Sequence, residues 1–356
     1  MSAPPRPTHL VVRAGARAAR QVRDEGLAPE AFDTLVGASG GPKWLVLRHL
    51  DDVLIDRVIR PRRTPLDVVG SSIGSFRHAC FAQKDPHDAL RRFTEAYTEQ
   101  AYEGRPSMEA ISIESQRILR ALLGDDGAQE VVGNRLVRSH VLATRLRRDR
   151  GRDRGPAFQW QMGRAAALNL ISRRLLATTL ARVHFHSGEA AIGFEDFSTT
   201  EVPLSARTLP HALLASGSIP LVMAGVDALP EVGPMLFDGG VIDYHFDFRF
   251  RRRSGLVLFP HFFDRITPGW FDKALRWRRP RPADLEDVVM IAPSDAFVAS
   301  LPGGRIPDRN DFLELDTDER IRRWRTTMDR ARALADEFQA LLDRRGLGDA
   351  VRGFDT

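Results

Sequence analysis

The sequence predicts an α/β fold of three layers, in which a mostly parallel central sheet is flanked by helices. The main observation is alternation: short apolar runs of strand length are separated by stretches whose apolar residues recur every three or four positions. In addition, two glycine-rich turns, at 37–41 and 70–74, each follow an apolar run and precede a helical pattern. In such folds the loops after the strands carry the functional groups, so we expect a site at these two turns.

The N-terminal half is expected to begin with a strand or helix over 8–26. A helix should follow the first glycine-rich turn, since Pro42 suits its first turn. Asp85 and Pro86 predict the cap and first residue of a helix that reaches about residue 103. Another helix is expected over 108–123, ending at Gly124. The arginine-rich stretch at 145–156 is predicted to be a loop.

The C-terminal half is expected to add strands at 183–187, 256–260 and 287–292 and one long amphipathic helix. Asp316 and Glu319 can form the capping box of this helix, and Gly346 can end it. Its apolar stripe should pack on the core. The stripe consists of Ile321, Trp324, Met328, Ala331, Ala335, Phe338 and Leu342.

The turn at 70–74 reads G-x-S-x-G directly after the apolar run 66–69. This strand–turn–helix context holds a serine, here Ser72, on a sharp elbow with its hydroxyl exposed. Gly70 and Gly74 suit such a turn because side chains would clash in it. A serine hydroxyl is a weak nucleophile until a base takes its proton. Asp238, at the end of the apolar run 235–237 and before Gly239 and Gly240, is the candidate base, so the residues predict a serine acyl hydrolase.

The other turn, in the run Gly37-Ala38-Ser39-Gly40-Gly41-Pro42-Lys43, offers backbone amides at a helix start. Such amides lack partners within the helix and lie at the positive end of its dipole, so they suit an oxyanion.

Taken in order, the glycine-rich loop, the G-x-S-x-G turn and the D-G-G turn resemble the patatin-like phospholipases, which hydrolyse acyl esters with a Ser–Asp dyad. The run at 212–220 also resembles the family's segment ahead of its acid. The resemblance implies Ser72 as nucleophile, Asp238 as base and the amides of Gly40 and Gly41 as oxyanion hole, with no cofactor or metal. It spans 31–250, which we take as a patatin-like acyl hydrolase core between an N-terminal lead-in (1–30) and a C-terminal extension (251–356) packed on it.

The resemblance also gives supporting positions: Gly37 and Lys43 in the loop, Gly70 and Gly74 at the elbow, and Gly239 and Gly240 after the acid. The chain departs from the family at two places. Trp44 stands where the last glycine of the family's loop, G-G-x-R/K-G, is usual, and the acidic residue often found before that loop is missing.

Several alternatives compete with these assignments. Ser39 also sits in a G-x-S-x-G frame, and Asp243 is a second acid close to Asp238. The first loop approaches a nucleotide-binding P-loop but lacks the glycine and hydroxyl that this motif needs at positions 42 and 44. Histidines could supply the third member of a triad; the candidates are His184, His186, His211, His245 and His261. Aromatic residues near the acid either line an acyl pocket or form core strands: Phe246, Phe248, Phe250, Phe259, Phe262 and Phe263.

Composition sets the remaining expectations. The single cysteine, Cys80, excludes an internal disulfide and suits a reducing compartment. We see no secretory signal and no apolar run long enough to span a bilayer, so we expect a cytoplasmic protein. The net charge is +5, and arginines concentrate at 145–154 without a nucleic-acid motif. That run is expected to be a solvated loop or, in the functional alternative, to draw the protein to an anionic membrane surface.

The expected function is therefore hydrolysis of carboxylic esters of lipids through an acyl-enzyme. One alternative within this class is an esterase, thioesterase or polyester depolymerase, because the motifs report acyl transfer and not chain length. An alternative in another class is a non-catalytic lipid-binding protein on the same fold.

Overall fold

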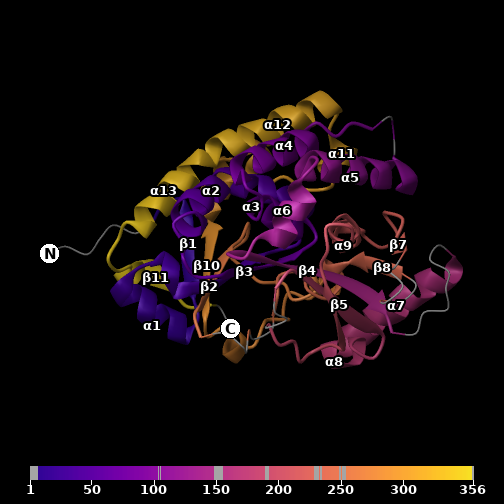
Figure 1. Ribbon diagram of the computed structural model, residues 1–356, viewed down its shortest axis with the longest axis horizontal. Helices are drawn as coiled ribbons and strands as arrows, with labels where there is room; N and C mark the ends of the chain where they lie inside the picture. Colours follow the sequence, from indigo (N-terminus) through magenta and orange to yellow (C-terminus); the bar gives the residue numbers. More distant parts are fainter. Residues whose placement is uncertain are drawn as a thin grey trace.

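The computed structural model describes residues 7–102, 104, 106–147, 155–188, 192–227, 232, 235–247, 250 and 254–354. Within them the chain forms one 11-stranded mixed sheet with the order β11-β1-β10-β9-β2-β3-β4-β5-β6, while β8 pairs with β4 and β7 (Figure 1). The strands are β1 (Leu10–Ala14), β2 (Phe32–Gly37), β3 (Leu66–Ser71), β4 (Val137–Leu146), β5 (Leu180–His186), β6 (Thr199–Pro203), β7 (Val226–Asp227), β8 (Met235–Asp238), β9 (Leu256–Pro260), β10 (Val288–Pro293) and β11 (Val351–Arg352).

The centre of the sheet is parallel, from β10 through β9, β2 and β3 to β4. Every residue of β3 is buried, as expected for a parallel strand covered on both faces. The register pairs Gly37 of β2 with Gly70 of β3, so the two glycine-rich turns leave the sheet side by side. The predicted α/β fold with a mostly parallel sheet is confirmed.

Helices flank the sheet. The α-helices are α1 (Ala16–Glu25), α2 (Arg48–Val53), α3 (Ile73–Phe81), α4 (Pro86–Thr98), α5 (Met108–Leu123), α6 (Gly127–Gly133), α7 (Pro156–Ile171), α8 (Arg173–Leu176), α9 (Leu209–Gly217), α10 (Asp295–Ser300), α11 (Asp311–Glu314), α12 (Thr317–Arg330) and α13 (Arg332–Leu342). Short 3₁₀ helices are η1 (Pro29–Ala31), η2 (Gly41–Leu47), η4 (Gly239–Val241), η5 (Trp270–Asp272), η6 (Pro282–Asp284), η7 (Pro302–Gly304) and η8 (Gly348–Ala350), and η3 (Leu54–Ile59) is a π-helix. In Figure 1, α2, α3, α4, α12 and α13 lie above the strands, and α1 lies below them.

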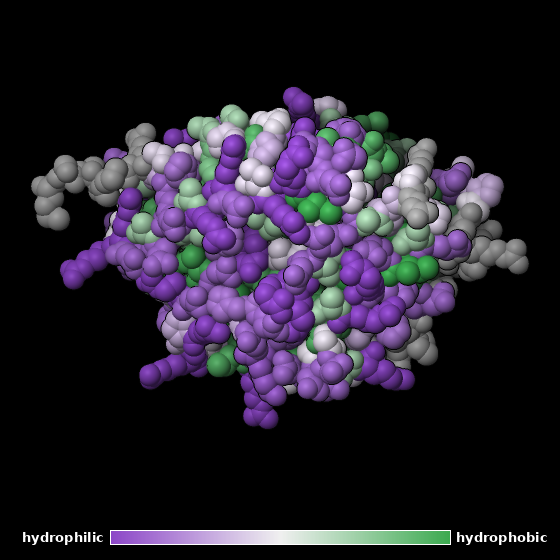
Figure 2. Space-filling model, turned by 90° about the horizontal axis from the view of Figure 1, so that it is seen from above, coloured by the Kyte–Doolittle hydropathy of each residue, from purple (hydrophilic) through white to green (hydrophobic). Residues whose placement is uncertain are grey.

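The C-terminal amphipathic stretch forms two nearly continuous helices, α12 and α13, that meet at Ala331. Asp316 caps α12 by accepting a hydrogen bond from the Glu319 amide, as predicted. Trp324 and Phe338 are fully buried, so the apolar stripe packs on the core. Figure 2 looks onto this side of the molecule, where the surface is mostly hydrophilic. The predicted packing is confirmed, although the predicted single helix is two.

The other predicted elements are found with shifted ends. The segment 8–26 contains both a strand and a helix, β1 and α1. The helix after Asp85 ends at Thr98 rather than near 103, and α5 has the predicted bounds and stops at Gly124 with φ +55°. β4 continues to Leu146, and residues 148–154 of the predicted arginine-rich loop lie outside the described residues.

The sheet crosses both predicted domain boundaries. Strands β9 and β10, from the C-terminal extension, lie between β1 and β2. The stretch 1–30 contributes β1, which pairs with β10 and β11. No helix in the described ranges is both long and apolar enough to cross a membrane.

Candidate active site

Ser72 lies on a sharp turn between β3 and α3. Its backbone has φ 55° and ψ −129°, a conformation that non-glycine residues rarely adopt and that is typically found where function requires strain. The two glycines of the motif are needed for close approach. A Cβ at Gly70 would overlap the backbone of Ser75, and a Cβ at Gly74 would overlap the carbonyl of Gly37. The predicted elbow is therefore present, with Ser72 at its tip.

Asp238 ends β8 and contacts Ser72 directly. The Ser72 hydroxyl donates a hydrogen bond of 2.8 Å to Oδ2 of Asp238, and the Gly240 amide donates one of 2.6 Å to Oδ1. The antiparallel pairing of β8 with β4 brings the acid beside the end of β3. At Gly239 a side chain would overlap the Leu142 carbonyl, which explains a glycine directly after the acid. The structure thus joins the two motifs that lie 166 residues apart in the sequence.

Burial raises the pKa of the Asp238 carboxyl to about 6, because desolvation disfavours the charged form. The hydrogen bonds from Ser72 and Gly240 and the positive charges of Lys273 and Arg309 act in the opposite direction. The carboxyl is therefore charged near neutral pH, yet more basic than an exposed aspartate. Both properties suit a group that takes a proton from a hydroxyl.

The C-terminal end of α9 and the residue that caps it hold both members of this pair in place. The Ser72 amide donates to Oγ of Ser216 over 2.9 Å, and that hydroxyl donates to the Leu142 carbonyl over 2.6 Å. The Asp238 amide donates to the Ser218 carbonyl over 2.8 Å. Sequence reasoning marked the run 212–220 but did not assign roles to these two serines. No spacing rule could have found them, because their partners lie on other strands.

The glycine-rich loop places Gly40 and Gly41 beside Ser72, in the same small cavity. Gly41 has φ +56°, and Gly40 approaches the Phe262 ring so closely that a Cβ would overlap it. Among the described residues, neither glycine amide donates a hydrogen bond to another group. Both amides are thus free to bind an oxyanion, although the role itself stays a prediction.

Trp44 points away from the loop and into the core. It is fully buried and stacks on Phe93 with ring centroids 4.6 Å apart, beside Tyr97. The Trp44 side chain does not line the cavity at Ser72. A tryptophan in place of the family's glycine therefore does not cover the loop amides. Lys43 does reach the cavity, where it forms an ion pair with Asp308.

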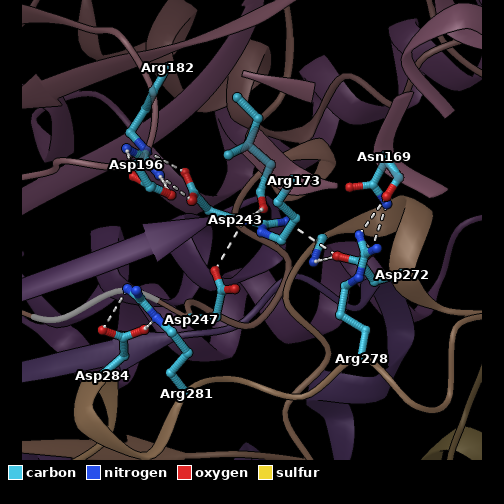
Figure 3. A network of polar contacts seen from close by, with 12 residues as sticks. Asn169, Arg173, Arg182, Asp196, Asp243, Asp247, Asp272, Arg278, Arg281 and Asp284 are labelled. Carbon is cyan, nitrogen blue, oxygen red and sulfur yellow. Dashed lines mark hydrogen bonds and ion pairs between the residues drawn. The ribbon is translucent and has the colours of Figure 1, made fainter. Parts of the chain in front are cut away.

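The competing nucleophile and acid have other partners. Ser39 lines the same cavity as Asp238, but its hydroxyl lies 2.8 Å from the Ser71 hydroxyl and, among the described residues, forms no hydrogen bond with an acid. Asp243 accepts two hydrogen bonds of 2.6 Å from the Arg182 guanidinium, which also pairs with Asp196 (Figure 3). This buried network fixes the chain that follows Gly240, so Asp243 is not available as a base.

No hydrogen bond joins a histidine to Ser72 or Asp238, and all ten histidines are in the described part of the chain. His184 lies 2.8 Å from His140, which contacts Asp67. The other candidates bond to main-chain groups: His186, His211, His245 and His261. The described ranges also contain no group of three or more His, Cys, Asp or Glu residues arranged to hold a metal.

Two cavities meet at Ser72. The first, which we call the polar cleft, measures about 80 Å³ and contains Ser72, Asp238, the loop glycines and three cationic side chains. The second, the apolar groove, measures about 590 Å³, within the range of about 300–1,000 Å³ usual for small-molecule sites. Its wall comes mainly from α3, α5, α9 and the segment 219–223, including Phe76, Ile111, Ile118, Leu214, Ile219 and Met223.

The aromatic residues near the acid do not line this groove. Phe246, Phe250, Phe259 and Phe262 are buried in the core, Phe263 is exposed, and Phe248 lies outside the described residues. Cys80 is buried too, and burial raises the pKa of its thiol above the usual range, so it is not a reactive thiol.

In searches against protein-family models and curated proteins, nothing matches this chain. The resemblance to patatin-like phospholipases therefore stays a prediction that rests on the motifs and on the geometry just described.

Proposed function

We propose that the protein is a serine acyl hydrolase that cleaves carboxylic esters of lipids through a Ser72–Asp238 dyad. The observation that carries the proposal is the 2.8 Å hydrogen bond from the Ser72 hydroxyl to the buried Asp238 carboxylate. It occurs on a strained turn beside the Gly40–Gly41 loop, with no histidine in contact. Acyl transfer requires a nucleophile in contact with a base and donors that stabilise the oxyanion, and the free backbone amides can be those donors.

The reaction would proceed in two halves. As Ser72 Oγ bonds to the ester carbonyl carbon, its proton passes to Asp238 Oδ2, and the loop amides stabilise the oxyanion. The carbonyl then re-forms, the bond to the alcohol oxygen breaks, and Asp238 returns the proton to the leaving alcohol. In the second half Asp238 takes a proton from the water that attacks the carbonyl carbon of the acyl-enzyme. When the bond from that carbon to Ser72 Oγ breaks, Asp238 returns the proton to Oγ, so the fatty acid leaves and the serine hydroxyl is restored. No cofactor enters either half.

The apolar groove supports a lipid acyl chain rather than a short acyl group. It opens directly at Ser72, and apolar side chains make up most of its wall. Exposed apolar residues, Met108, Leu221 and Leu313, also line it. Burial of each methylene of an acyl chain there would contribute roughly 0.8 kcal/mol. A non-catalytic lipid-binding protein would use the same groove, but it would need neither the strained serine nor its carboxylate partner.

The test is hydrolysis of p-nitrophenyl esters with acyl chains of graded length by wild type, Ser72→Ala and Ser39→Ala. Loss of Ser72 should reduce kcat by about 10⁴-fold or more, whereas Ser39→Ala should retain most activity. Leu214→Trp, which narrows the groove, should shift the preference towards shorter chains. Leu170→Trp, at an exposed position outside the groove, is its control. Unchanged turnover in Ser72→Ala would refute the proposal.

A further inference from the structure

The two cavities divide the surroundings of Ser72 into an apolar side and a charged side. They share Gly41, Ser72, Ile219 and Arg309, so the serine hydroxyl lies at their junction. An ester bound at the junction has an acyl part and an alcohol part, which extend in different directions from the carbonyl carbon. If the acyl chain occupies the apolar groove, the alcohol part must lie in the polar cleft.

The polar cleft has three cationic side chains, but only one of them is paired. Lys43 forms an ion pair with Asp308. Lys273 instead lies over aromatic rings, with Nζ 4.3 Å from the centroid of Tyr244 and 5.8 Å from that of Trp270. In the described part of the chain, neither Lys273 nor Arg309 forms an ion pair with a carboxylate. Two cations at the cleft therefore have no ion-pair partner among the described residues, although Asp308 and Asp238 also line the cleft.

The positive charges of the three cationic side chains in the cleft, Lys43, Lys273 and Arg309, repel one another. Desolvation at the cleft wall, followed by the charges of Lys43 and Arg309, lowers the pKa of the Lys273 ammonium to about 8. An anion bound between Lys273 and Arg309 would remove that repulsion and form charge-assisted hydrogen bonds. The charges of Asp238 and Asp308 act on Lys273 only through space, because Asp308 forms its ion pair with Lys43 and Asp238 is hydrogen-bonded to Ser72 and Gly240.

We propose that Lys273 and Arg309 form an anion subsite that selects esters whose alcohol part carries a phosphate or carboxylate group. The inference rests on the proposed function in assigning Ser72 as the attacked position. The substrate class is thus an acyl chain esterified to an alcohol that carries an anionic group close to the ester.

The test measures binding, so that it does not depend on turnover. Ser72→Ala protein is titrated calorimetrically with three ether analogues that cannot be hydrolysed: 1-O-decylglycerol 3-phosphate, 3-decyloxybutanoate and neutral 1-O-decylglycerol. At least one anionic analogue should bind about 10-fold more tightly than the neutral one, in keeping with hydrogen bonds between charged groups. Comparing the two anionic analogues shows whether the subsite prefers a phosphate or a carboxylate on the alcohol part.

Lys273→Gln and Arg309→Gln, each added to Ser72→Ala, should abolish this preference without weakening binding of the neutral analogue. Arg276→Gln is the matched control, because Arg276 lies three residues from Lys273 and is exposed outside the cleft. Equal binding of all three analogues, or an equal loss of preference in Arg276→Gln, would overturn the anion subsite.

Hydrolysis of p-nitrophenyl esters by the wild type separates the two proposals. If turnover is normal and depends on Ser72 but all three analogues bind equally, the proposed hydrolase function stands and the anion subsite is rejected. Selective anion binding that depends on Lys273 and Arg309, in a protein without any ester turnover, keeps the subsite and rejects the hydrolase.

Discussion

Ser39 and Ser72 occupy equivalent positions in the sequence but have different surroundings. Each stands in a G-x-S-x-G frame, and each follows one of two adjacent parallel strands whose glycines, Gly37 and Gly70, are in register. Ser72 has a positive φ and donates to a carboxylate, whereas Ser39 has no positive φ and its hydroxyl bonds to that of Ser71. A serine motif therefore identifies a position, and the backbone turn and the neighbouring acid determine whether it can be a nucleophile.

The chain after each serine explains the divergence. After Ser72 the helix α3 begins at once, so the serine itself sits at the turn. After Ser39 two glycines precede the helix: Gly40, with φ 177° and ψ 0°, and Gly41, with φ +56°. The second arrangement places the unbonded amides of Gly40 and Gly41 at the cavity, while the Ser39 hydroxyl is bonded to that of Ser71. Two similar sequences thus supply complementary parts of one candidate site.

The largest expected loss of activity follows from removing the acid that distinguishes Ser72 from Ser39. Asp238→Asn keeps the size of the side chain but cannot accept the Ser72 proton, so kcat should fall by about 10⁴-fold. In a dyad no histidine is equally necessary. Turnover should therefore persist when each of the ten histidines is replaced by alanine in turn. A folded histidine variant as inactive as Asp238→Asn would show that a triad operates instead.

The loop around Ser39 should contribute less, through its backbone. Gly41→Val forces a β-branched residue into a left-handed conformation, so the loop amides should move and kcat should fall by roughly 10²–10³-fold. Steady-state kinetics separate this effect from substrate binding, since KM should change little. Gly348→Val is the control, because Gly348 also has a positive φ but lies in open space away from the site. A raised KM with unchanged kcat would mean that the loop recognises substrate and not the oxyanion.

The smallest expected effect is a dependence of kcat/KM on pH that comes from the base of Ser72 and does not require Ser39. The base acts in its deprotonated form, and burial places the pKa of Asp238 at about 6. Activity should therefore rise about tenfold per pH unit below 6 and level off above it. A profile of kcat/KM between pH 4.5 and 8 measures this. The same profile in Ser39→Ala should be unchanged, and an inflection near 4 in the wild type would indicate an exposed acid rather than the buried Asp238.

Much of the fold could be predicted because it depends on local patterns. The strand at 256–260 and the helix at 108–123 were located by apolar runs, caps and a terminal glycine, all of which are local in sequence. The order of strands could not be predicted. The insertion of β9 and β10 between β1 and β2 depends on long-range pairing, which leaves no trace in periodicity. Likewise, the break at Ala331 follows no proline or glycine, so the apolar stripe alone predicted one continuous helix.

The candidate site likewise divides into residues marked by local motifs and residues that reach it from distant segments. The motifs marked Ser72, Asp238 and the loop glycines, because strained turns and close approaches restrict residue type. The supporting hydroxyl of Ser216 and the cations Lys273 and Arg309 were missed. Each reaches the site from a distant segment, and a lone serine, lysine or arginine has no distinctive spacing. The roles of the marked residues remain predictions until activity is measured.

The central claim, that Asp238 activates Ser72 and that Ser39 is not activated, is tested most directly by covalent labelling. A fluorophosphonate reacts with activated serines, and mass spectrometry of the digested protein locates the adduct. We predict about one label per chain, on the peptide that contains Ser72, with labelling retained in Ser39→Ala and lost in both Ser72→Ala and Asp238→Asn. An adduct on Ser39, or full labelling of Asp238→Asn, would contradict the account.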